Sequence, residues 1–341
     1  MRILLSASQA PFLRGGAEVH ADNLHAALER AGHEVERLKL PFKFVPEADV
    51  ARLMAFCDGY DVAAPNGQRV DRLISLQFPG YGMAHPQHVA WVLHQHRAMY
   101  ELFDAASATP AQVQLRAQVL DYDGRALRAV HRLFANSRRV AERMQQFNGV
   151  AATPLYHPPP GAELLRCAAE WGYVFFPSRL ESLKRQDLLI EAARHLRCPV
   201  KILLGGTGGQ HARYAQLIEL YGLQDRVRLM GNFTEAERVQ LYAHALGVVF
   251  VPRDEDLGYI TLEAMYAAKP VITCTDSGGP LEFVLPGQTG WVTEPTPEAL
   301  AEAIEALWAN KARSAAMGQA GRERVQSLGL SWDRVVETLC A

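Results

Sequence analysis

Two glutamates, Glu255 and Glu263, are spaced so that both carboxylates could lie at one ligand-binding site. The apolar run 248–251 predicts a buried strand before them, and the apolar periodicity predicts a helix from Thr261. Glu255 is therefore expected on the loop after the strand, and Glu263 in the first turn of the helix. Ligands of open α/β sheets bind at the carboxyl ends of strands, so both carboxylates could face one ligand. In the alternative interpretation, Glu263 only complements the helix dipole and Glu255 lies in a solvated loop.

Several other polar or glycine-rich loops follow predicted strands in the second half of the chain. Because the carboxyl ends of parallel strands meet at one edge of a sheet, these loops are expected to lie side by side. They comprise residues 178–184, 205–209, 231–233, 253–258 and 275–281.

These loops bring together the groups that a nucleotide sugar needs. Arg179 and Lys184 supply cations, and Gly278 and Gly279 offer backbone N–H groups beside a helix start, which suits a diphosphate. Carboxylates suit the hydroxyls of ribose or of a sugar. Taken singly, the two cations could equally be surface charges.

The first half of the chain opens like a Rossmann-like domain. A strand over 2–8, a loop over 11–16, a helix over 17–31 and a second strand from Gly32 form a βαβ unit. Gly15 and Gly16 would let a ligand approach the backbone closely, although a plain tight turn explains them as well. No G-x-G-x-x-G fingerprint is present, which argues against a nicotinamide-dependent dehydrogenase.

Two histidines, His94 and His96, follow the predicted strand 88–93, where a site residue is expected. Two histidines without a nearby carboxylate are a weak ligand set, so no metal site is predicted. Polar residues that merely close a strand are the alternative.

Length and element order together indicate two domains. The proline-rich segment 156–161 is the best linker, so an N-terminal domain over 1–160 and a C-terminal domain over 161–330 are expected. Predicted strands and helices alternate from Tyr173 to Cys274, which predicts a second parallel-sheet α/β domain. Residues 331–341 form a final helix, and residues 41–68 show no clear periodicity.

Composition excludes several classes of protein. A net charge of −2 gives no indication of nucleic-acid binding, and no apolar run is long enough to span a bilayer. The five cysteines form no C-x-x-C pair, which fits a reducing cytoplasm rather than a zinc or disulfide framework. The arginine-rich stretch 125–143 is interpreted as a solvated helix face, with contact to an anionic membrane as the alternative.

The sequence resembles the retaining glycosyltransferases of family 4. This resemblance is carried by several motifs over nearly the whole chain: Ser178-Arg179-Leu180 with Lys184-Arg185, residues 227–231, the E-x7-E pair Glu255 and Glu263, residues 269–272 and 277–282, and, in the first half, residues 15–18 and 134–137. It implies the GT-B fold, in which two Rossmann-like, doubly wound parallel-sheet domains face each other across a cleft. In this family the last helix crosses back to the first domain, so 331–341 is expected to pack there.

The resemblance also implies a role for each motif residue. Glu255 contacts the transferred sugar near its reacting carbon, Glu263 binds the ribose hydroxyls, and either His94 or His96 reaches the reacting centre. The remaining assignments are Arg179, Lys184, Gly278, Gly279, Gly15 and Gly16 at the donor diphosphate, and Gly231, Asn232 and Phe233 near the nucleobase.

The implied activity is transfer of a sugar, with retention, from a UDP- or GDP-sugar to a lipid-linked or polysaccharide or lipopolysaccharide acceptor. No metal and no cofactor are expected, because the donor is a substrate and, as the resemblance implies, members of this fold need no metal. The expected location is the cytoplasm, including peripheral contact with the inner membrane. A small soluble acceptor and a non-catalytic nucleotide-sugar-binding protein remain as alternatives.

Overall fold

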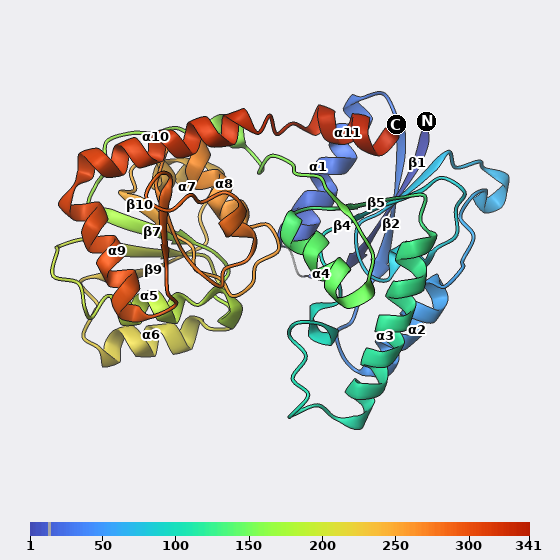
Figure 1. Cartoon of the computed structure of the whole chain (residues 1–341), viewed down its shortest axis with the longest axis horizontal. Coiled ribbons are helices and arrows are strands. Elements are labelled where there is room, and N and C mark those ends of the chain that lie inside the picture. The colour runs from blue at the N-terminus through green and yellow to red at the C-terminus, as the bar shows by residue number, and fades with distance from the viewer. Residues whose placement is uncertain (13–14) are drawn as a thin grey trace. The chain divides into compact units, whose positions relative to one another are not determined.

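The chain divides into two units, each built on its own parallel sheet. The computed structural model in Figure 1 describes residues 1–12 and 15–341. Unit 1 comprises residues 1–157 together with 331–341, and unit 2 comprises residues 158–330.

Unit 1 has a six-stranded sheet in the order β2-β1-β3-β4-β5-β6, with every neighbouring pair parallel. The sheet grows outward from β1 in both directions, as in doubly wound folds. Its strands are β1 (Arg2–Gln9), β2 (Glu34–Pro41), β3 (Arg72–Ser75), β4 (His88–Val92), β5 (Arg132–Ala135) and β6 (Thr153–Pro154).

The helices of unit 1 are α1 (Gly16–Arg30), α2 (Glu47–Cys57), α3 (Pro110–Ala129), α4 (Arg138–Asn148) and α11 (Trp332–Cys340). Local sequence signals explain several of their ends. Ser137 caps α4 by accepting the N–H of Val140, as its sequence position indicates, and Gly149 ends that helix in the left-handed region. The helix α2 lies in the segment whose periodicity predicts no element.

The C-terminal helix α11 belongs to the hydrophobic core of unit 1. Val335 and Leu339 are fully buried in one cluster with Leu5 of β1 and Leu24 of α1. Burying each such side chain contributes about 1.5–3 kcal/mol, so α11 is anchored by apolar packing.

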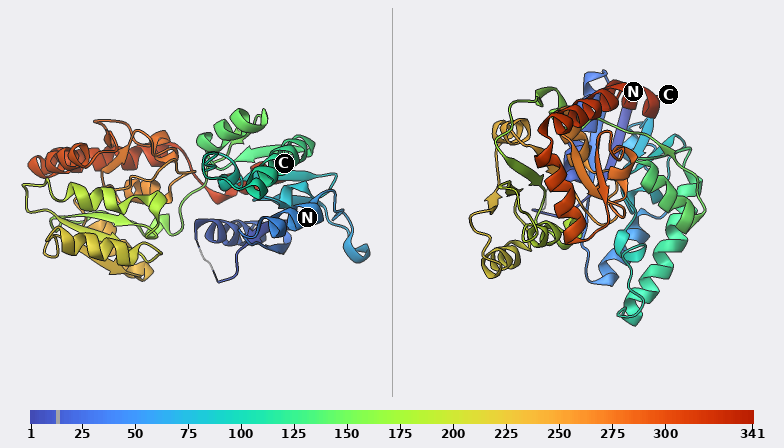
Figure 2. Two further views of the ribbon diagram at one scale, coloured as in Figure 1. Left: turned by 90° about the horizontal axis from the view of Figure 1, so that it is seen from below. Right: turned by 60° about the vertical axis from the view of Figure 1, so that its left-hand side comes forward.

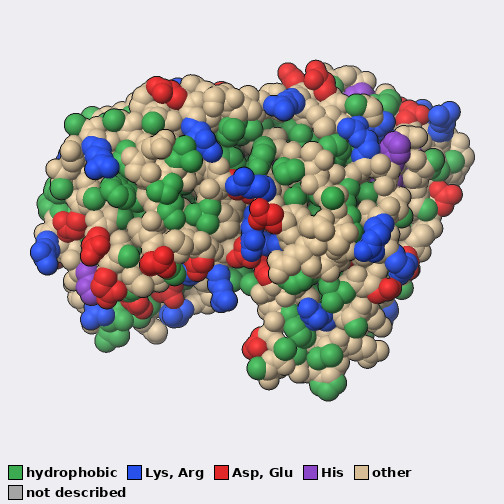
Figure 3. Space-filling view, viewed as in Figure 1, with side chains coloured by type: hydrophobic (Ala, Val, Ile, Leu, Met, Phe, Trp, Pro, Cys, Tyr) green, Lys and Arg blue, Asp and Glu red, His purple; other side chains and the backbone are tan. Residues whose placement is uncertain are grey.

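The arginines of the stretch 125–143 are engaged within unit 1. Arg125 pairs with Asp58 at 3.3 Å, Arg128 donates to the carbonyl of Asn148 at 2.6 Å, and Arg143 lies 3.5 Å from Glu101. On the face shown in Figure 3, basic and acidic side chains are interspersed rather than gathered by sign. These contacts favour the solvated and structural interpretation of the stretch.

Unit 2 has a second six-stranded parallel sheet, in the order β12-β11-β10-β7-β8-β9. Its strands are β7 (Tyr173–Pro177), β8 (Lys201–Gly205), β9 (Val227–Gly231), β10 (Gly247–Val249), β11 (Val271–Cys274) and β12 (Gly290–Thr293). Its helices are α5 (Gln186–Ala192), α6 (His211–Leu220), α7 (Glu235–Ala243), α8 (Tyr259–Tyr266), α9 (Pro297–Ala309) and α10 (Lys311–Ser327).

Helices cover both faces of this sheet, with α6 on one side and α10 on the other (Figure 2). The strands between them are buried on both faces, which is why they appear in the sequence as continuous apolar runs such as Tyr173–Pro177. This layering leaves the loops at the carboxyl ends of the strands free to carry polar residues.

Candidate active site

The loops after β7, β10 and β11 lie side by side at the carboxyl edge of the unit 2 sheet. Backbone hydrogen bonds join them: Arg253 donates to Leu183 at 2.8 Å, and Glu255 donates to Ser277 at 2.9 Å. The expected clustering of these three loops is therefore confirmed. Their side chains are presented from a rigid sheet, which favours precise placement around a ligand.

Lys184 and Glu255 form an ion pair between two of these loops. Lys184 ends a short 3₁₀ turn after β7, and its ammonium also lies 5.7 Å from the ring centroid of Phe250. The side chains are 19% and 17% exposed, so the pair is mostly shielded but still reachable from solvent. A cation and a carboxylate thus occupy one point of the edge.

Arg179 and Arg185, the two arginines in the loop after β7, differ in their surroundings. Arg179 is exposed on the loop after β7, where an anion can reach it. The guanidinium of Arg185 is instead occupied by hydrogen bonds within the protein. It contacts both carboxylate oxygens of Asp276 at 2.6–2.7 Å and the carbonyls of Val251 and Pro252. Arg185 therefore braces the loops that Lys184 and Glu255 occupy.

Gly278 and Gly279 are glycines because a neighbouring loop approaches them closely. Gly278 has a φ of +72°, and a Cβ there would lie 2.5 Å from the carbonyl oxygen of Glu255. A Cβ at Gly279 would lie 2.6 Å from the carbonyl oxygen of Asp256. The N–H of Gly279 donates to Glu255 at 2.8 Å, so it is engaged within the protein rather than offered to a ligand as the sequence suggests.

Glu263 lies in the second turn of α8, not in the first. The helix begins at Tyr259, two residues before the predicted start, because Gly258 turns the chain with a φ of +84°. The Oε1 atom of Glu263 lies 2.9 Å from Arg238, and its Oε2 accepts a hydrogen bond from Tyr242. These side-chain partners and its place beyond the first turn argue against a mere helix-dipole role.

Sequence reasoning misses Arg238 and Tyr242 as partners of Glu263. The two residues lie four apart on α7 and so share one face of that helix. Nothing in the sequence indicates that this face meets Glu263. Burial raises the pKa of Glu263, and the charge of Arg238 and the hydrogen bonds from Tyr242 and Arg238 act in the opposite direction.

Residues 231–233 comprise the last residue of β9 and the two residues after it, at the same sheet edge. The carbonyl of Gly231 accepts from Gly206 at 2.8 Å, Asn232 accepts from the Thr207 hydroxyl at 3.2 Å, and Phe233 packs against Phe175. The segment is therefore held against the glycine-rich loop after β8.

The glycine loop of unit 1 leads directly into α1. Gly15 is the N-cap of the helix, and its N–H donates to the carboxylate of Glu18 at 2.8 Å. Gly16 is the first helical residue and is exposed. Leu13 and Arg14 of the predicted loop lie outside the described residues.

The structure distinguishes His94 from His96 by their surroundings. His96 is buried, and its ring stacks on Phe78 with centroids 5.4 Å apart and planes 11° apart. Burial, assisted by nearby His94, lowers the pKa of His96 to about 4, which keeps this ring neutral. His94 is half-buried, with its Nδ1 2.8 Å from the carbonyl of Gln95, so it is the more accessible of the two.

A buried polar chain runs beneath these histidines. The amide of Gln95 donates to Asn148, Asn148 donates to the hydroxyl of Tyr100 at 3.2 Å, and Tyr100 donates to Asp123 at 2.5 Å. Burial raises the pKa of Asp123 to about 7, although the hydrogen bond from Tyr100 opposes that increase. The chain connects a titratable carboxyl to the loop that carries both histidines.

We expect Asp123→Asn to change how stability depends on pH. A pKa near 7 in the folded protein exceeds the value of 3.8 for an ordinary aspartate, so the native state binds this proton more tightly than the unfolded chain does. The resulting contribution to the free energy of unfolding is complete below about pH 4 and is lost as the pH rises through about 7. It amounts to about 4 kcal/mol at most. Urea unfolding across this range should show the wild type losing stability relative to the variant. A pH-independent difference between the two would contradict the assignment.

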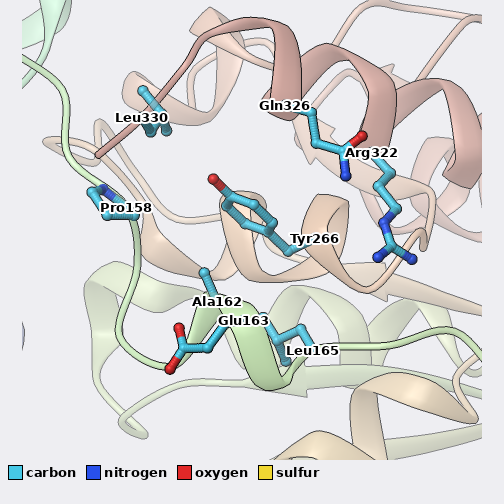
Figure 4. Close-up of a pocket in the computed structure, with 8 residues that line it drawn as sticks. All are labelled: Pro158, Ala162, Glu163, Leu165, Tyr266, Arg322, Gln326 and Leu330. Carbon is cyan, nitrogen blue, oxygen red and sulfur yellow. The ribbon is translucent and has the colours of Figure 1, made fainter. Parts of the chain in front are cut away.

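A pocket of about 370 Å³ lies elsewhere in unit 2, where the chain enters and leaves it (Figure 4). The ring of Tyr266 projects into it between Pro158 on one side and Arg322 of α10 on the other. None of the residues lining it is a predicted site residue.

The C-terminal unit matches a known family. Residues 169–324 fit the family model described as glycosyl transferases group 1. The chain matches this family through unit 2, over less than half of its length. It is 32% identical over 165 residues to the human alpha-1,3/1,6-mannosyltransferase ALG2, covering 44% of this chain and 39% of that protein. It is 26% identical over 283 residues to a D-inositol 3-phosphate glycosyltransferase of Kineococcus radiotolerans, covering 72% of this chain and 64% of that one. The chain thus spans less than two thirds of either relative.

Comparison with solved structures shows the fold of the chain. Sucrose-phosphate synthase from Thermosynechococcus elongatus aligns with a TM-score of 0.80 and 19% identity, covering 99% of this chain and 97% of that one. Anabaena HepE in complex with UDP and glucose aligns with a TM-score of 0.73 and 20% identity, covering 99% of both chains. The predicted GT-B class, with two Rossmann-like parallel-sheet domains, is confirmed. None of the described helices is both long and apolar enough to cross a membrane.

Proposed function

We propose that the protein transfers a hexosyl group, with retention, from a UDP- or GDP-sugar to an acceptor hydroxyl. The observation that carries this proposal is the Lys184–Glu255 ion pair at the carboxyl edge of the unit 2 sheet. It puts a cation, the kind of group that suits a diphosphate, directly beside a carboxylate, the kind of group that suits sugar hydroxyls. Glu263 lies on the helix that follows the same loop, where it would accept the hydroxyls of the ribose.

In this proposal, donor binding reorganises the ion pair. The diphosphate attracts Lys184, which frees Glu255 to accept hydrogen bonds from the sugar near its anomeric carbon. As the bond to the diphosphate breaks, negative charge grows on the leaving oxygen and positive charge on the carbon. Lys184 and Arg179 stabilise the leaving group electrostatically, so these cations need no assistance from a metal.

The proposed acceptor is lipid-linked or part of a polysaccharide. An apolar surface supports this choice, because Phe44 is 60% and Val45 69% exposed on the loop after β2. The ring of Phe44 lies 6.5 Å from that of His96, so this surface borders the loop with the two histidines. We place the enzyme in the cytoplasm with peripheral access to a membrane, consistent with five cysteines that form no disulfide.

A small soluble acceptor is the second candidate. It is favoured by the relative that covers most of this chain, which is named a D-inositol 3-phosphate glycosyltransferase, and by the structural likeness to a sucrose-phosphate synthase. Offering a polyprenyl-phosphate-linked sugar and a soluble sugar phosphate in parallel transfer assays would separate the two acceptors.

A thermal-shift screen with UDP, GDP, ADP and dTDP tests the donor assignment. A ligand at about 100 times its Kd stabilises the folded state by about 2.7 kcal/mol, so the correct base should raise the Tm by several degrees. We expect one diphosphate, UDP or GDP, to dominate. If none of the four shifts the Tm, the proposed function is wrong.

A further inference from the structure

Arg238 connects three groups that lie far apart in the sequence. Its guanidinium lies 2.9 Å from Glu263, donates to the carbonyl of Pro160 at 3.0 Å and lies 3.3 Å from Glu235. The side chain is only 14% exposed. Desolvating a charge costs several kcal/mol. A shielded guanidinium whose donors are directed at a carboxylate therefore suggests that the residue has a role.

The carboxylate of Glu263 is surrounded by groups from two helices. Arg238 and Tyr242 approach it from α7, one at each oxygen, and Tyr259 of its own helix lies close enough for the Glu263 charge to raise the pKa of that phenol, after the larger effect of burial. Burial raises the pKa of Glu263 itself, and the charge of Arg238 is the largest influence that lowers it. Without Arg238, this carboxyl would hold its proton at a higher pH.

Each oxygen of a carboxylate can accept two hydrogen bonds. Arg238 takes one position on Oε1 and Tyr242 takes one on Oε2, which leaves a further position on each oxygen. Two adjacent ribose hydroxyls can fill those positions only if the carboxylate is charged and held in this orientation. The side chain of Glu263 keeps 13% of its surface exposed, so a ligand can reach it.

We propose that Arg238 is a positioning residue for the nucleotide, which keeps Glu263 ionised and oriented to accept the ribose hydroxyls. This inference rests on the proposed function, because it assumes that Glu263 binds ribose. Tyr242 assists by holding the second oxygen. The same guanidinium anchors the chain where it enters unit 2, since it donates to Pro160 next to Gly161, where a Cβ would lie 2.8 Å from Nη2.

The test is the pH dependence of nucleotide affinity. UDP, GDP, ADP and dTDP are titrated calorimetrically into the full-length wild type, Arg238→Met, Arg238→Lys and Tyr242→Phe between about pH 5 and 8.5. We expect Arg238→Met to bind at least about ten-fold more weakly at neutral pH, because a charged hydrogen-bond partner is lost. As the pH is lowered, its affinity for the nucleotide should also begin to fall at a higher pH than that of the wild type. Arg238→Lys should restore the wild-type pH profile in part.

Glu237→Ala is the matched control, because Glu237 closes the capping box of the same helix without contacting Glu263. It should lower the Tm and leave the pH profile of binding unchanged. If Arg238→Met does not fold, Tyr242→Phe carries the test, since it removes only the hydroxyl that holds Oε2. Variants with the affinity and pH profile of the wild type would overturn the inference alone. A wild type that binds none of the four diphosphates would overturn the proposed function with it.

Discussion

Replacing Lys184 with alanine should reduce sugar transfer by at least about thirty-fold, because losing one partner of a shielded charge pair costs about 2–5 kcal/mol. The lysine is the cation closest to Glu255, with which it forms an ion pair. Its loss leaves that carboxylate uncompensated at the proposed diphosphate site. The expected result is loss of both donor affinity and turnover, measured as nucleoside diphosphate released from the donor in the presence of acceptor.

The matched control is Lys311→Ala. Lys311 also belongs to an ion pair, with Glu170 at 2.6 Å, but it lies at the start of α10, in a pair that includes none of the site residues. Its removal should leave the transfer rate within about two-fold of the wild type, as exposed ion pairs contribute about 0–1 kcal/mol. Wild-type turnover in Lys184→Ala would remove the basis of the proposed donor site.

Replacing Glu263 with alanine should abolish nucleotide binding and also destabilise unit 2. The ribose would lose its acceptor, and the guanidinium of Arg238 would be left shielded without its main counter-charge. Breaking a buried pair in this way costs about 3–5 kcal/mol. Calorimetric titration of the diphosphate should therefore show no binding, and urea unfolding should show a lower free energy of unfolding.

Glu263→Gln separates these two effects, because it keeps the shape and one acceptor oxygen while removing the charge. We expect it to unfold at a urea concentration closer to that of the wild type and still to bind nucleotide more weakly by about ten-fold. Glu219→Ala, at an exposed position on α6, serves as the unaffected control. Full nucleotide affinity in Glu263→Ala would show that the ribose is held elsewhere.

The overall fold of the protein can be predicted from the sequence. Apolar runs such as 248–251 are continuous because both faces of the sheet are covered. This pattern can be recognised in the sequence alone. Loops between such runs must share a sheet edge, since parallel strands all point the same way. That rule is enough to bring Lys184, Glu255 and Gly278 together before any coordinates are considered.

Elements without a strong local pattern escape sequence reasoning. The helix α2 packs through Val50, Met54 and Cys57, but its short length and mixed surroundings hide that periodicity in residues 41–68. The start of α8 is shifted because it depends on the backbone conformation of Gly258, which the apolar pattern of the helix does not report.

The two parallel-sheet domains, the family motifs and the set of residues at the unit 2 edge can all be predicted from the sequence, because they depend on strand order and local spacing. The folded structure is needed to see which groups already have partners. The N–H of Gly279 donates to the backbone carbonyl of Glu255, Arg185 pairs with Asp276, and His96 is stacked inside an aromatic cluster. The partnership of Arg238 with Glu263 is of the same kind. Such pairings form between segments that meet only after folding, so no spacing along the chain encodes them.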